Sequence, residues 1–417
     1  NAPGVAVMVI RGGQVLHNKG YGLARLDKNE AIGTNTAFEI GSTAKQFTAM
    51  AVMMLAERGK LGLDDTLAKF FPEFPAHAKT ITVRHLLTHT SGLVDVINFS
   101  WFKKGYEPTS KEVMKMLARE QALRFAPGDK FEYNNAGYML LALIVEKASG
   151  QSFARFMKEN IFQPLSMNST LVFDESRPRP ARMATSYYFE ANTFKPFDLT
   201  SDVFIYGAKG IFSTLDDLFK WDQALETEKL VKAPMLKQAF TSAKLNNGME
   251  TQYGFGWYTG KENGLDVIEH GGGYLGYRAT IRRYPGQRAT VVLLSNNATI
   301  KATPLARKIA QIYLADEMKA PAGAKVDLSI LKEYVGKYEG DPNVMPNLMI
   351  DITLEDGELY ITSPIKPKTR LLAQSNTLFV IAETASNVTF NRDEKGGVNG
   401  LTLTTRRGTI GARKLSQ

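Results

Sequence analysis

Residues 38–60, FEIGSTAKQFTAMAVMMLAERGK, hold the clearest structural pattern of this chain. After Gly41, apolar residues recur at the spacing of one helical face; they are Phe47, Ala51, Met54 and Leu55. Gly59 stands where a C-terminal cap belongs, so a helix is predicted between the two glycines. Residues three apart on a helix share a face, and Ser42 and Lys45 are therefore expected to touch.

The pair Ser42 and Lys45 has a chemical meaning if the two side chains meet. A hydroxyl is a weak nucleophile until a base removes its proton. Burial and the positive end of a helix both lower the pKa of a lysine, so Lys45 can be that base. The alternative is that Ser42 only caps the helix and that Lys45 is a solvated surface residue. The flanking apolar residues favour burial; they are Phe47, Met50, Met53 and Met54.

Two further polar motifs follow in the chain. Tyr-Asn-Asn at 133–135 lies in PGDKFEYNNAGYMLLALIVEKASG (127–150), where a turn leads into an apolar helix. His-Gly-Gly-Gly at 270–273 lies in VIEHGGGYLGYRATIRRYPGQRATVVLLSNN (267–297), where alternating strands flank a glycine-rich bend. A lone Ser-x-x-Lys arises by chance in many helices, so the interpretation depends on all three motifs in order.

Ser-x-x-Lys, Tyr-x-Asn and His-x-Gly, in this order, resemble the motifs of the serine β-lactamase and penicillin-binding-protein superfamily. The chain is most similar to the branch that holds class C β-lactamases, D-alanyl-D-alanine carboxypeptidases, D-aminopeptidases and related esterases. The resemblance spans residues 1–315 and includes four connecting segments: APGVAVMVIRGGQVLHNKGYG, VRHLLTHTSGL, NIFQPLSMNST and GAKGIFSTLDDLFKW. Family members usually carry a helix before the first segment, so we expect a processed or truncated form.

The resemblance implies a role in acyl transfer for each motif residue. Ser42 is the candidate nucleophile, and Lys45 takes or relays its proton. Tyr133 is a second candidate base. Its phenol ordinarily titrates at about pH 10, but nearby cations can hold it as the phenolate. In class C relatives the matching tyrosine is tied to activation of the deacylating water. Asn135 is expected to orient Lys45 and bond the substrate amide. A turn role is its alternative, and is the preferred interpretation of Asn134.

His270 occupies the position where many relatives have the lysine of Lys-Thr-Gly. A donor there can contact Tyr133 and supply a proton to the leaving group. A histidine does this with a charge that changes near neutral pH. The alternative is a histidine at a strand end with a purely local hydrogen bond.

The three glycines after His270 have distinct expected effects. Gly271 replaces the threonine whose hydroxyl helps to grip a β-lactam carboxylate, which counts against efficient penicillinase activity. Gly272 permits close approach of the strand. The backbone N–H groups of Gly273 and Ser42 are expected to form the oxyanion hole, the largest electrostatic contribution in acyl transfer.

Two cationic residues depart from the expected pattern. Lys209 in GAKGIFST replaces a usual small residue, and Arg278 follows the glycine bend within a strand. Either side chain can bind a substrate carboxylate such as a peptide C-terminus, and arginine suits bidentate recognition of that group. Surface charge without a ligand is the alternative for both.

The pattern of residues 1–315 predicts one domain whose antiparallel sheet is assembled from both chain ends. Strand-like runs occur near both ends; they cover about 5–10, 14–23, 254–258, 266–270, 277–284 and 289–296. A helical subdomain at about 65–205 is inserted between them, and an amphipathic helix at 302–315 follows. This is an α/β (α+β) fold of the β-lactamase and transpeptidase type. A ligand cleft is expected at the junction of its two subdomains.

The chain beyond residue 315 has a different pattern. Residues 316–327, DEMKAPAGAKVD, are rich in Ala, Pro and Gly and are interpreted as a linker. About eight short alternating runs in 328–417 predict a small antiparallel β-barrel. This part resembles the lipocalin-like modules of some D-aminopeptidase-like members. It has no titratable constellation, so stability or shielding of the main domain is preferred over a ligand-binding cup.

Composition excludes several classes of function. The 417 residues include no cysteine, which rules out disulfides and thiol chemistry. The net charge of +9 comes from scattered residues without a reading motif, so no nucleic-acid partner is predicted. Apolar runs such as 139–145 are far shorter than the roughly 20 residues of a transmembrane helix. His85 and His89 have the i, i+4 spacing of two zinc ligands, but Leu86 stands where a zincin has glutamate and no third ligand is suggested, so no zinc site is predicted.

These features together predict a periplasmic or secreted serine hydrolase that needs no metal or cofactor. D-amino-acid peptides and small esters rank above β-lactams as substrates, and β-lactams are also candidate inhibitors. One alternative is a class C-type β-lactamase. Another is a non-catalytic envelope protein that binds cell-wall peptides, although such a protein has no physical reason to retain all four of Ser42, Lys45, Tyr133 and His270. The oligomeric state is not defined by the sequence.

Overall fold

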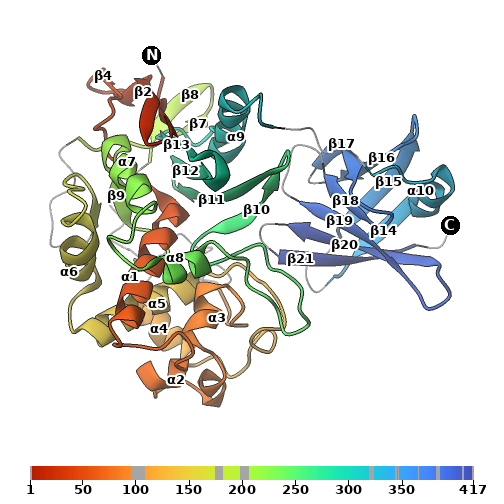
Figure 1. Cartoon of the computed structure of the whole chain (residues 1–417), viewed down its shortest axis with the longest axis horizontal. Coiled ribbons are helices and arrows are strands. Elements are labelled where there is room, and N and C mark those ends of the chain that lie inside the picture. Colours follow the sequence, from red (N-terminus) through yellow and green to blue (C-terminus); the bar gives the residue numbers. More distant parts are fainter. Residues whose placement is uncertain are drawn as a thin grey trace. The chain divides into compact units, whose positions relative to one another are not determined.

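The computed structural model shows a mixed α/β chain with a closed C-terminal barrel, which confirms the predicted fold class (Figure 1). The chain forms two compact units. The first comprises Asn1–Lys130, Asn134–Lys261 and Leu265–Glu317, and the second Phe131–Tyr133, Glu262–Gly264 and Met318–Gln417. The described residues are 2–95, 109–173, 182–197, 206–318, 324–342, 345, 347–364, 366–381, 386–405 and 408–415. The linker expected at 316–327 therefore falls partly outside them, as does part of the helical region expected at 65–205.

A six-stranded sheet forms the centre of the first unit, in the order β10-β11-β12-β13-β1-β2. The strands are β1 (Val5–Arg11), β2 (Gln14–Tyr21), β10 (Tyr258–Glu262), β11 (Leu265–Tyr274), β12 (Tyr277–Tyr284) and β13 (Ala289–Ser295). The first strand pairs antiparallel with the last, with Val5 opposite Ser295. The two ends of the first unit thus meet in one sheet, as the sequence pattern predicts.

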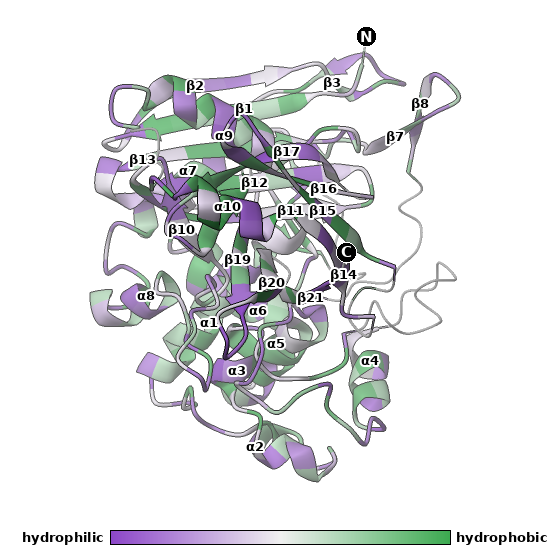
Figure 2. Ribbon diagram, turned by 90° about the vertical axis from the view of Figure 1, so that its right-hand side faces the viewer, coloured by the Kyte–Doolittle hydropathy of each residue, from purple (hydrophilic) through white to green (hydrophobic). Residues whose placement is uncertain are grey.

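Both faces of the sheet are covered, because successive side chains of a strand point to opposite faces. Met8 and Leu294 belong to the main hydrophobic core, while their neighbours Val7 and Leu293 form a second cluster with Ala302. That alanine begins α9 (Ala302–Tyr313), which packs on β12 and β13. The apolar residues of the sheet and of α1 and α5 appear in green in Figure 2.

The main core surrounds two helices, α1 (Lys45–Glu57) and α5 (Asn135–Ser149), which pack against each other. Ten successive residues of α5, from Ala136 to Val145, are buried, as expected for a helix that is apolar on all sides. It ends at Gly150 in the left-handed conformation, with φ 71°. Within the part of the chain that the structure describes, no helix has the length and apolar character needed to span a bilayer.

Shorter elements complete the first unit. The helical ones are η1 (Gly41–Ala44), α2 (Leu67–Phe70), η2 (Ala76–Lys79), α3 (Val83–Leu87), α4 (Ser110–Leu117), α6 (Phe153–Met157), η5 (Lys158–Phe162), α7 (Leu215–Ala224), α8 (Ala233–Ala239) and η6 (Pro285–Gln287). The strands are β3 (Leu23–Arg25), β4 (Glu30–Ala31), β5 (Phe38–Glu39), β6 (Leu171–Val172), β7 (Tyr187–Glu190), β8 (Thr193–Pro196) and β9 (Ile211–Ser213).

One predicted strand is placed differently. The run expected at 254–258 begins as β10 only at Tyr258. Gly256 has φ +79°, and a Cβ atom built on it would lie 2.8 Å from the backbone oxygen of Lys45. A close backbone approach to the start of α1 therefore interrupts the strand.

The second unit is built on a closed antiparallel barrel. Its strands are β14 (Gly336–Gly340), β15 (Met349–Glu355), β16 (Glu358–Ser363), β17 (Lys366–Ala373), β18 (Leu378–Ile381), β19 (Asn387–Arg392), β20 (Val398–Thr405) and β21 (Gly408–Lys414). The eight strands agree with the number predicted. Alternate residues such as Ile350 and Ile352 fill the interior, and the ring of Tyr334 from α10 (Leu328–Tyr334) stacks on Phe390 at 3.9 Å between centroids.

Candidate functional site

The turn η1 places Ser42 three residues before Lys45, the first residue of α1. Gly41 opens this turn with φ +54°, a conformation that favours glycine. The buried carboxylate of Glu39 fixes the turn, because its Oε2 accepts a hydrogen bond of 2.7 Å from the Gly41 N–H. Its Oε1 accepts another of 2.8 Å from Gly210 N–H. The loop before β9 and the start of α1 are thus tied to one side chain.

Lys45 is fully buried and faces Ser42, as the three-residue spacing predicts. Its Nζ lies 3.2 Å from Ser42 Oγ, 2.9 Å from Asn135 Oδ1 and 3.1 Å from the Ala208 carbonyl oxygen. A neutral amine has two N–H bonds and one lone pair. Asn135 and Ala208 offer acceptors for the two N–H bonds, so the lone pair is directed to the Ser42 hydroxyl.

Burial lowers the pKa of Lys45 to about 7, since an ammonium loses its hydration there. The carboxylate of Asp95 acts in the opposite direction, the charge of Lys209 lowers the pKa further, and Glu39 raises it. At neutral pH a large fraction of Lys45 is therefore the free amine that can accept a proton.

Asn135 reaches Lys45 because it is the first residue of α5. Asn134 is the N-cap of this helix, and its side chain accepts a hydrogen bond of 2.9 Å from Gly137 N–H. The backbone N–H of Asn134 donates to Nδ1 of His89 at 3.1 Å, and this histidine is deeply buried with φ +58°. The structure thus gives Asn134 the structural role that the sequence favours.

Tyr133 precedes these two asparagines directly, and its hydroxyl oxygen is buried. It lies in the segment Phe131–Tyr133 of the second unit. Its role as a second base, and its contact with His270, remain predictions from the sequence.

His270 is almost fully buried in β11 and has a partner that sequence reasoning missed. Its Nδ1 lies 2.8 Å from the carbonyl oxygen of Gly271, and its Nε2 lies 3.0 Å from the hydroxyl of Tyr253. A carbonyl only accepts, so Nδ1 carries the proton and Nε2 accepts from the tyrosine. Burial, followed by the charge of Lys45, lowers the pKa of His270 to about 3. Its charge therefore does not change near neutral pH, in contrast to the expectation from sequence.

The strand β11 approaches the Ser42 turn backbone to backbone. A Cβ atom built on Gly272 would lie 2.0 Å from the oxygen of Ile40 and 3.0 Å from the nitrogen of Ser42. A Cβ atom on Gly41 would lie 2.4 Å from the nitrogen of Gly273. These approaches bring the backbone N–H groups of residues 42 and 273 to the same part of the site, where an oxyanion hole needs them.

Alanine at position 272 should therefore disturb both packing and reactivity. We expect Gly272→Ala to lower the free energy of unfolding of the first unit by about 1–3 kcal/mol. It should also slow acylation of Ser42 at least about tenfold, because a small misplacement of reacting groups is costly. Gly260→Ala is the matched control, since a Cβ atom built there meets nothing within 4 Å. Denaturant unfolding and the rate of serine labelling measure the two effects; equal behaviour of both variants would contradict the close-approach argument.

The environment of Gly271 explains part of its departure from the threonine of relatives. A Cβ atom there would lie 2.6 Å from the hydroxyl oxygen of Thr303 in α9. A side chain at residue 271 would therefore collide with Thr303 unless that side chain moved.

Two cations lie near the glycine bend. Arg278 pairs with Gly273 across the β11–β12 hairpin, and its Nη1 donates to the carbonyl oxygens of Leu275 and Tyr277, both at 2.7 Å. Partial burial lowers the pKa of this guanidinium. Lys209 Nζ stands 3.6 Å from the ring centroid of Tyr274, within cation–π distance.

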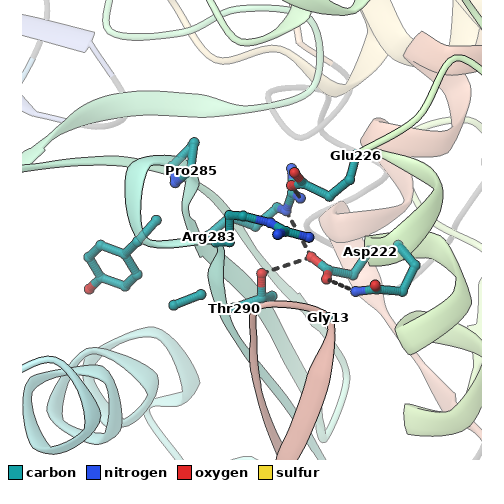
Figure 3. A pocket seen from close by; sticks show the side chains of 10 residues that line it. Gly13, Asp222, Glu226, Arg283, Pro285 and Thr290 are labelled. Carbon is teal, nitrogen blue, oxygen red and sulfur yellow. Dashed lines mark hydrogen bonds and ion pairs between the residues drawn. The ribbon is translucent and has the colours of Figure 1, made fainter.

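The geometry supports neither a metal site nor a binding role for a second cavity. Among the described residues, no group of three or more His, Asp or Glu side chains could hold a metal ion. A small cavity near the β12–β13 turn contains the ion pair of Arg283 with Asp222 and Glu226, and Thr290 donates to Asp222 at 2.8 Å (Figure 3). Arg288 also lines the cavity, so two arginines offset two carboxylates. No residue of the three motifs lines this cavity, and we assign it a structural role.

Sequence reasoning missed three buried polar residues of the site: Glu39, Asp95 and Tyr253. Glu39 stands inside FEIGSTAK, and Asp95 stands two residues after VRHLLTHTSGL; both segments carry the family resemblance. Buried carboxylates beside a motif are the signal that could have revealed them. Tyr253 has no such local signal.

Comparisons with known proteins show the family of this chain. The beta-lactamase family model matches residues 1–314. Penicillin-binding protein 4* of Bacillus subtilis (strain 168) is 32% identical over 418 residues, covering 93% of this chain and 90% of the relative. Protein flp of Staphylococcus aureus (strain MW2) is 28% identical over 304 residues, covering 70% and 59%.

Solved structures show the same fold over most or nearly all of the chain. The octameric penicillin-binding protein homologue from Pyrococcus abyssi has a TM-score of 0.66 at 24% identity, covering 98% of this chain and 96% of that one. The penicillin-binding protein from Bacillus halodurans has a TM-score of 0.64 at 25% identity, covering 74% and 94%.

Proposed function

The chain belongs to the beta-lactamase family, whose serine hydrolases react through an acyl-enzyme, and we propose that Ser42 is the nucleophile. The observation that carries this proposal is the Lys45 amine, fully buried and 3.2 Å from Ser42 Oγ, with acceptors available for both of its N–H bonds. A serine whose hydroxyl faces a lone pair of this kind is activated for attack.

The reaction proceeds in two halves. Ser42 Oγ attacks the substrate carbonyl carbon while its proton passes to Lys45 Nζ, and the N–H groups of residues 42 and 273 hold the oxyanion. Collapse of the tetrahedral intermediate breaks the amide or ester bond, and the leaving group takes a proton from Lys45 or Tyr133. A water molecule, deprotonated by the same bases, then attacks the acyl carbon. The bond from that carbon to Ser42 Oγ breaks, the base returns the proton to Oγ, and the acid is released. His270 is neutral and bonds the hydroxyl of Tyr253, so no proton transfer is assigned to it.

Peptides that contain D-amino acids and small esters are the proposed substrates. Lys209 and Arg278 place two cations near the glycine bend, which favours a carbonyl compound with a carboxylate nearby. The relatives named as penicillin-binding proteins support β-lactams as further acylating ligands. Gly271 lacks the hydroxyl that grips a β-lactam carboxylate, which places efficient β-lactam turnover below peptide and ester hydrolysis.

A substrate panel tests this proposal. Wild type and Ser42→Ala would be incubated with a D-alanyl-D-alanine peptide, a p-nitrophenyl ester and a chromogenic cephalosporin. We expect hydrolysis of the peptide or the ester, slow or no turnover of the cephalosporin, and no reaction of the variant. Rapid turnover of the cephalosporin alone would favour a β-lactamase, and binding of the peptide without hydrolysis of any compound would favour a cell-wall binding protein.

Arg278 is proposed to bind the carboxylate at the C-terminus of a peptide substrate. Arg278→Ala should lower kcat/KM for a peptide with a free carboxylate by about tenfold to a hundredfold, since bonds to charged groups contribute about 1.5–3 kcal/mol. The amidated peptide should be nearly unaffected. This paired substrate is the control, because loss of the bonds to Leu275 and Tyr277 disturbs the turn equally for both peptides. Equal losses would rule out carboxylate recognition, and Lys209→Ala would be measured in parallel.

The relatives named as penicillin-binding proteins support an extracytoplasmic site of action, in the periplasm or after secretion. The barrel is proposed to act as a lipocalin-like module that stabilises or shields the hydrolase unit. Its interior is occupied by its own apolar side chains in the described part, which favours this role over a ligand-binding cup.

A further inference from the structure

Asp95 is a buried carboxylate at the N-terminus of α5 that the reaction described above does not use. It is only 2% exposed. Its Oδ1 accepts hydrogen bonds from the backbone N–H groups of Asn135 at 3.0 Å and Ala136 at 3.3 Å. Its Oδ2 accepts from the side-chain Nδ2 of Asn135 at 3.0 Å. The carboxylate therefore holds both the backbone and the side chain of one motif residue.

This contact determines which way the Asn135 amide points. A carboxylate only accepts hydrogen bonds, so it requires the NH₂ end of the amide. The oxygen end then faces Lys45 Nζ, at 2.9 Å. We infer that Asp95 is a positioning residue, which fixes the Asn135 amide so that its oxygen receives an N–H of Lys45 and the lysine lone pair is directed to Ser42. The inference rests on the proposed function of Ser42 and Lys45.

The charges around the lysine support this arrangement. Burial raises the pKa of Asp95, while its bonds to Asn135, the charge of Lys45 and the bond to Ala136 all favour the ionised form. The ionised carboxylate in turn raises the pKa of Lys45 against the effect of burial.

Other titratable groups face Lys45 from several elements. Lys209, before β9, lowers its pKa and Glu39, in β5, raises it. His89, after α3, and His270, in β11, both have their own pKa lowered by burial and by the lysine charge. Both imidazoles are therefore neutral near pH 7, and Asp95 precedes Glu39 as the larger negative contribution at Lys45.

Asp95→Asn tests the inference because the new amide has nearly the same shape as the carboxylate but carries no charge. An amide can both donate and accept hydrogen bonds, so it no longer fixes the orientation of the Asn135 amide. Asp217→Asn is the matched control. Asp217 is also 2% exposed and also accepts three hydrogen bonds, from Ser169, Thr170 and Lys220 at 2.8–2.9 Å, without touching the motif residues. Both variants remove a buried carboxylate and are expected to be less stable than wild type.

The first measurement is the labelling rate of Ser42 by a fluorophosphonate as a function of pH. In this reaction Ser42 Oγ forms a bond to phosphorus, fluoride leaves, and Lys45 takes the proton. We expect Asp95→Asn to lower the plateau rate about tenfold, or about 1.4 kcal/mol, and to move the midpoint to lower pH. Asp217→Asn should keep the plateau and midpoint of wild type.

The second measurement does not depend on reaction at Ser42. The ¹³Cε resonance of Lys45, identified by its absence in Lys45→Met, reports the lysine pKa directly, and Asp95→Asn should lower this midpoint. If wild type is not labelled but Asp95→Asn still lowers the midpoint of the ¹³Cε titration, the nucleophile proposal is wrong and the effect of Asp95 on Lys45 is supported. The Asp95 inference would be overturned by a different result. In that case wild type is labelled normally, and Asp95→Asn and Asp217→Asn have the same plateau rate, the same midpoint of labelling and the same midpoint of the ¹³Cε titration.

A double-mutant cycle tests whether Asp95 acts through Asn135. If it does, Asp95→Asn should lower the plateau rate little further in the background of Asn135→Ala, because the amide to be oriented is gone. If the double variant instead lost rate by the product of the two single losses, the two residues would act independently and the positioning role would be overturned.

Discussion

Replacement of Lys45 by methionine is expected to slow acylation of Ser42 by about 10²–10⁴-fold, the usual contribution of a general base. Methionine keeps much of the apolar length of the side chain but has no lone pair that can take the Ser42 proton. The rate of fluorophosphonate labelling measures the effect, with circular dichroism as the test of folding. A folded Lys45→Met protein that is labelled as fast as wild type would contradict the role of Lys45.

The pH dependence of wild type gives the same account a second test. The labelling rate should rise with pH and level off above about 7, because only the neutral amine accepts a proton. The same lowered pKa affects stability. Between about pH 7 and the ordinary lysine value of 10.5, the unfolded chain binds more protons at this residue than the folded chain. Lys45 therefore makes stability increase with pH across this window, and Lys45→Met should remove that contribution. A labelling rate that does not change from pH 5 to 9 would exclude Lys45 as the base.

Ser42→Ala is expected to reduce hydrolysis of the ester or peptide substrate by at least about 10⁴-fold, as the loss of a catalytic nucleophile does in other serine hydrolases. The backbone N–H of residue 42 remains, so the oxyanion hole and substrate binding should persist. Initial rates at saturating substrate measure the loss.

Ser152→Ala serves as the control for this substitution. Ser152 also stands at the start of a helix, where its side chain accepts a hydrogen bond from Arg155 N–H at 3.3 Å, but it has no lysine partner. Its replacement should lower stability by about 0.5–2 kcal/mol and leave turnover unchanged. Residual turnover in Ser42→Ala close to that of Ser152→Ala would mean that another residue is the nucleophile.

Local spacing made the centre of the site predictable from the sequence. Ser42 and Lys45 meet because residues three apart share a helical face, and the burial of Lys45 follows from its apolar neighbours. The alternating runs at both ends of the first unit correctly predicted a shared sheet, and the regular short runs beyond residue 327 correctly predicted a barrel. The ordered motifs also identified the family, which the comparisons confirm.

Contacts between distant segments limited the rest of the prediction. Tyr253 bonds His270 from the position directly before the expected strand, and in that segment Gly256, with φ +79°, brings the backbone close to the start of α1. The consequence was large, since burial in this arrangement lowers the pKa of His270 far below the value assumed for an exposed ring. Asp95 shows the same limit, because its partner Asn135 is 40 residues away in the chain.

Intact-mass spectrometry with peptide mapping tests the central claim most directly. Wild type and Ser42→Ala would each be incubated with a fluorophosphonate and, separately, with a penicillin. We predict one adduct per chain from the fluorophosphonate, mapped to Ser42 and absent in the variant, and a penicillin adduct on the same residue if the β-lactam acylates the site. An adduct on another residue, or no adduct from either reagent on folded wild type, would contradict the assignment of Ser42 as the nucleophile.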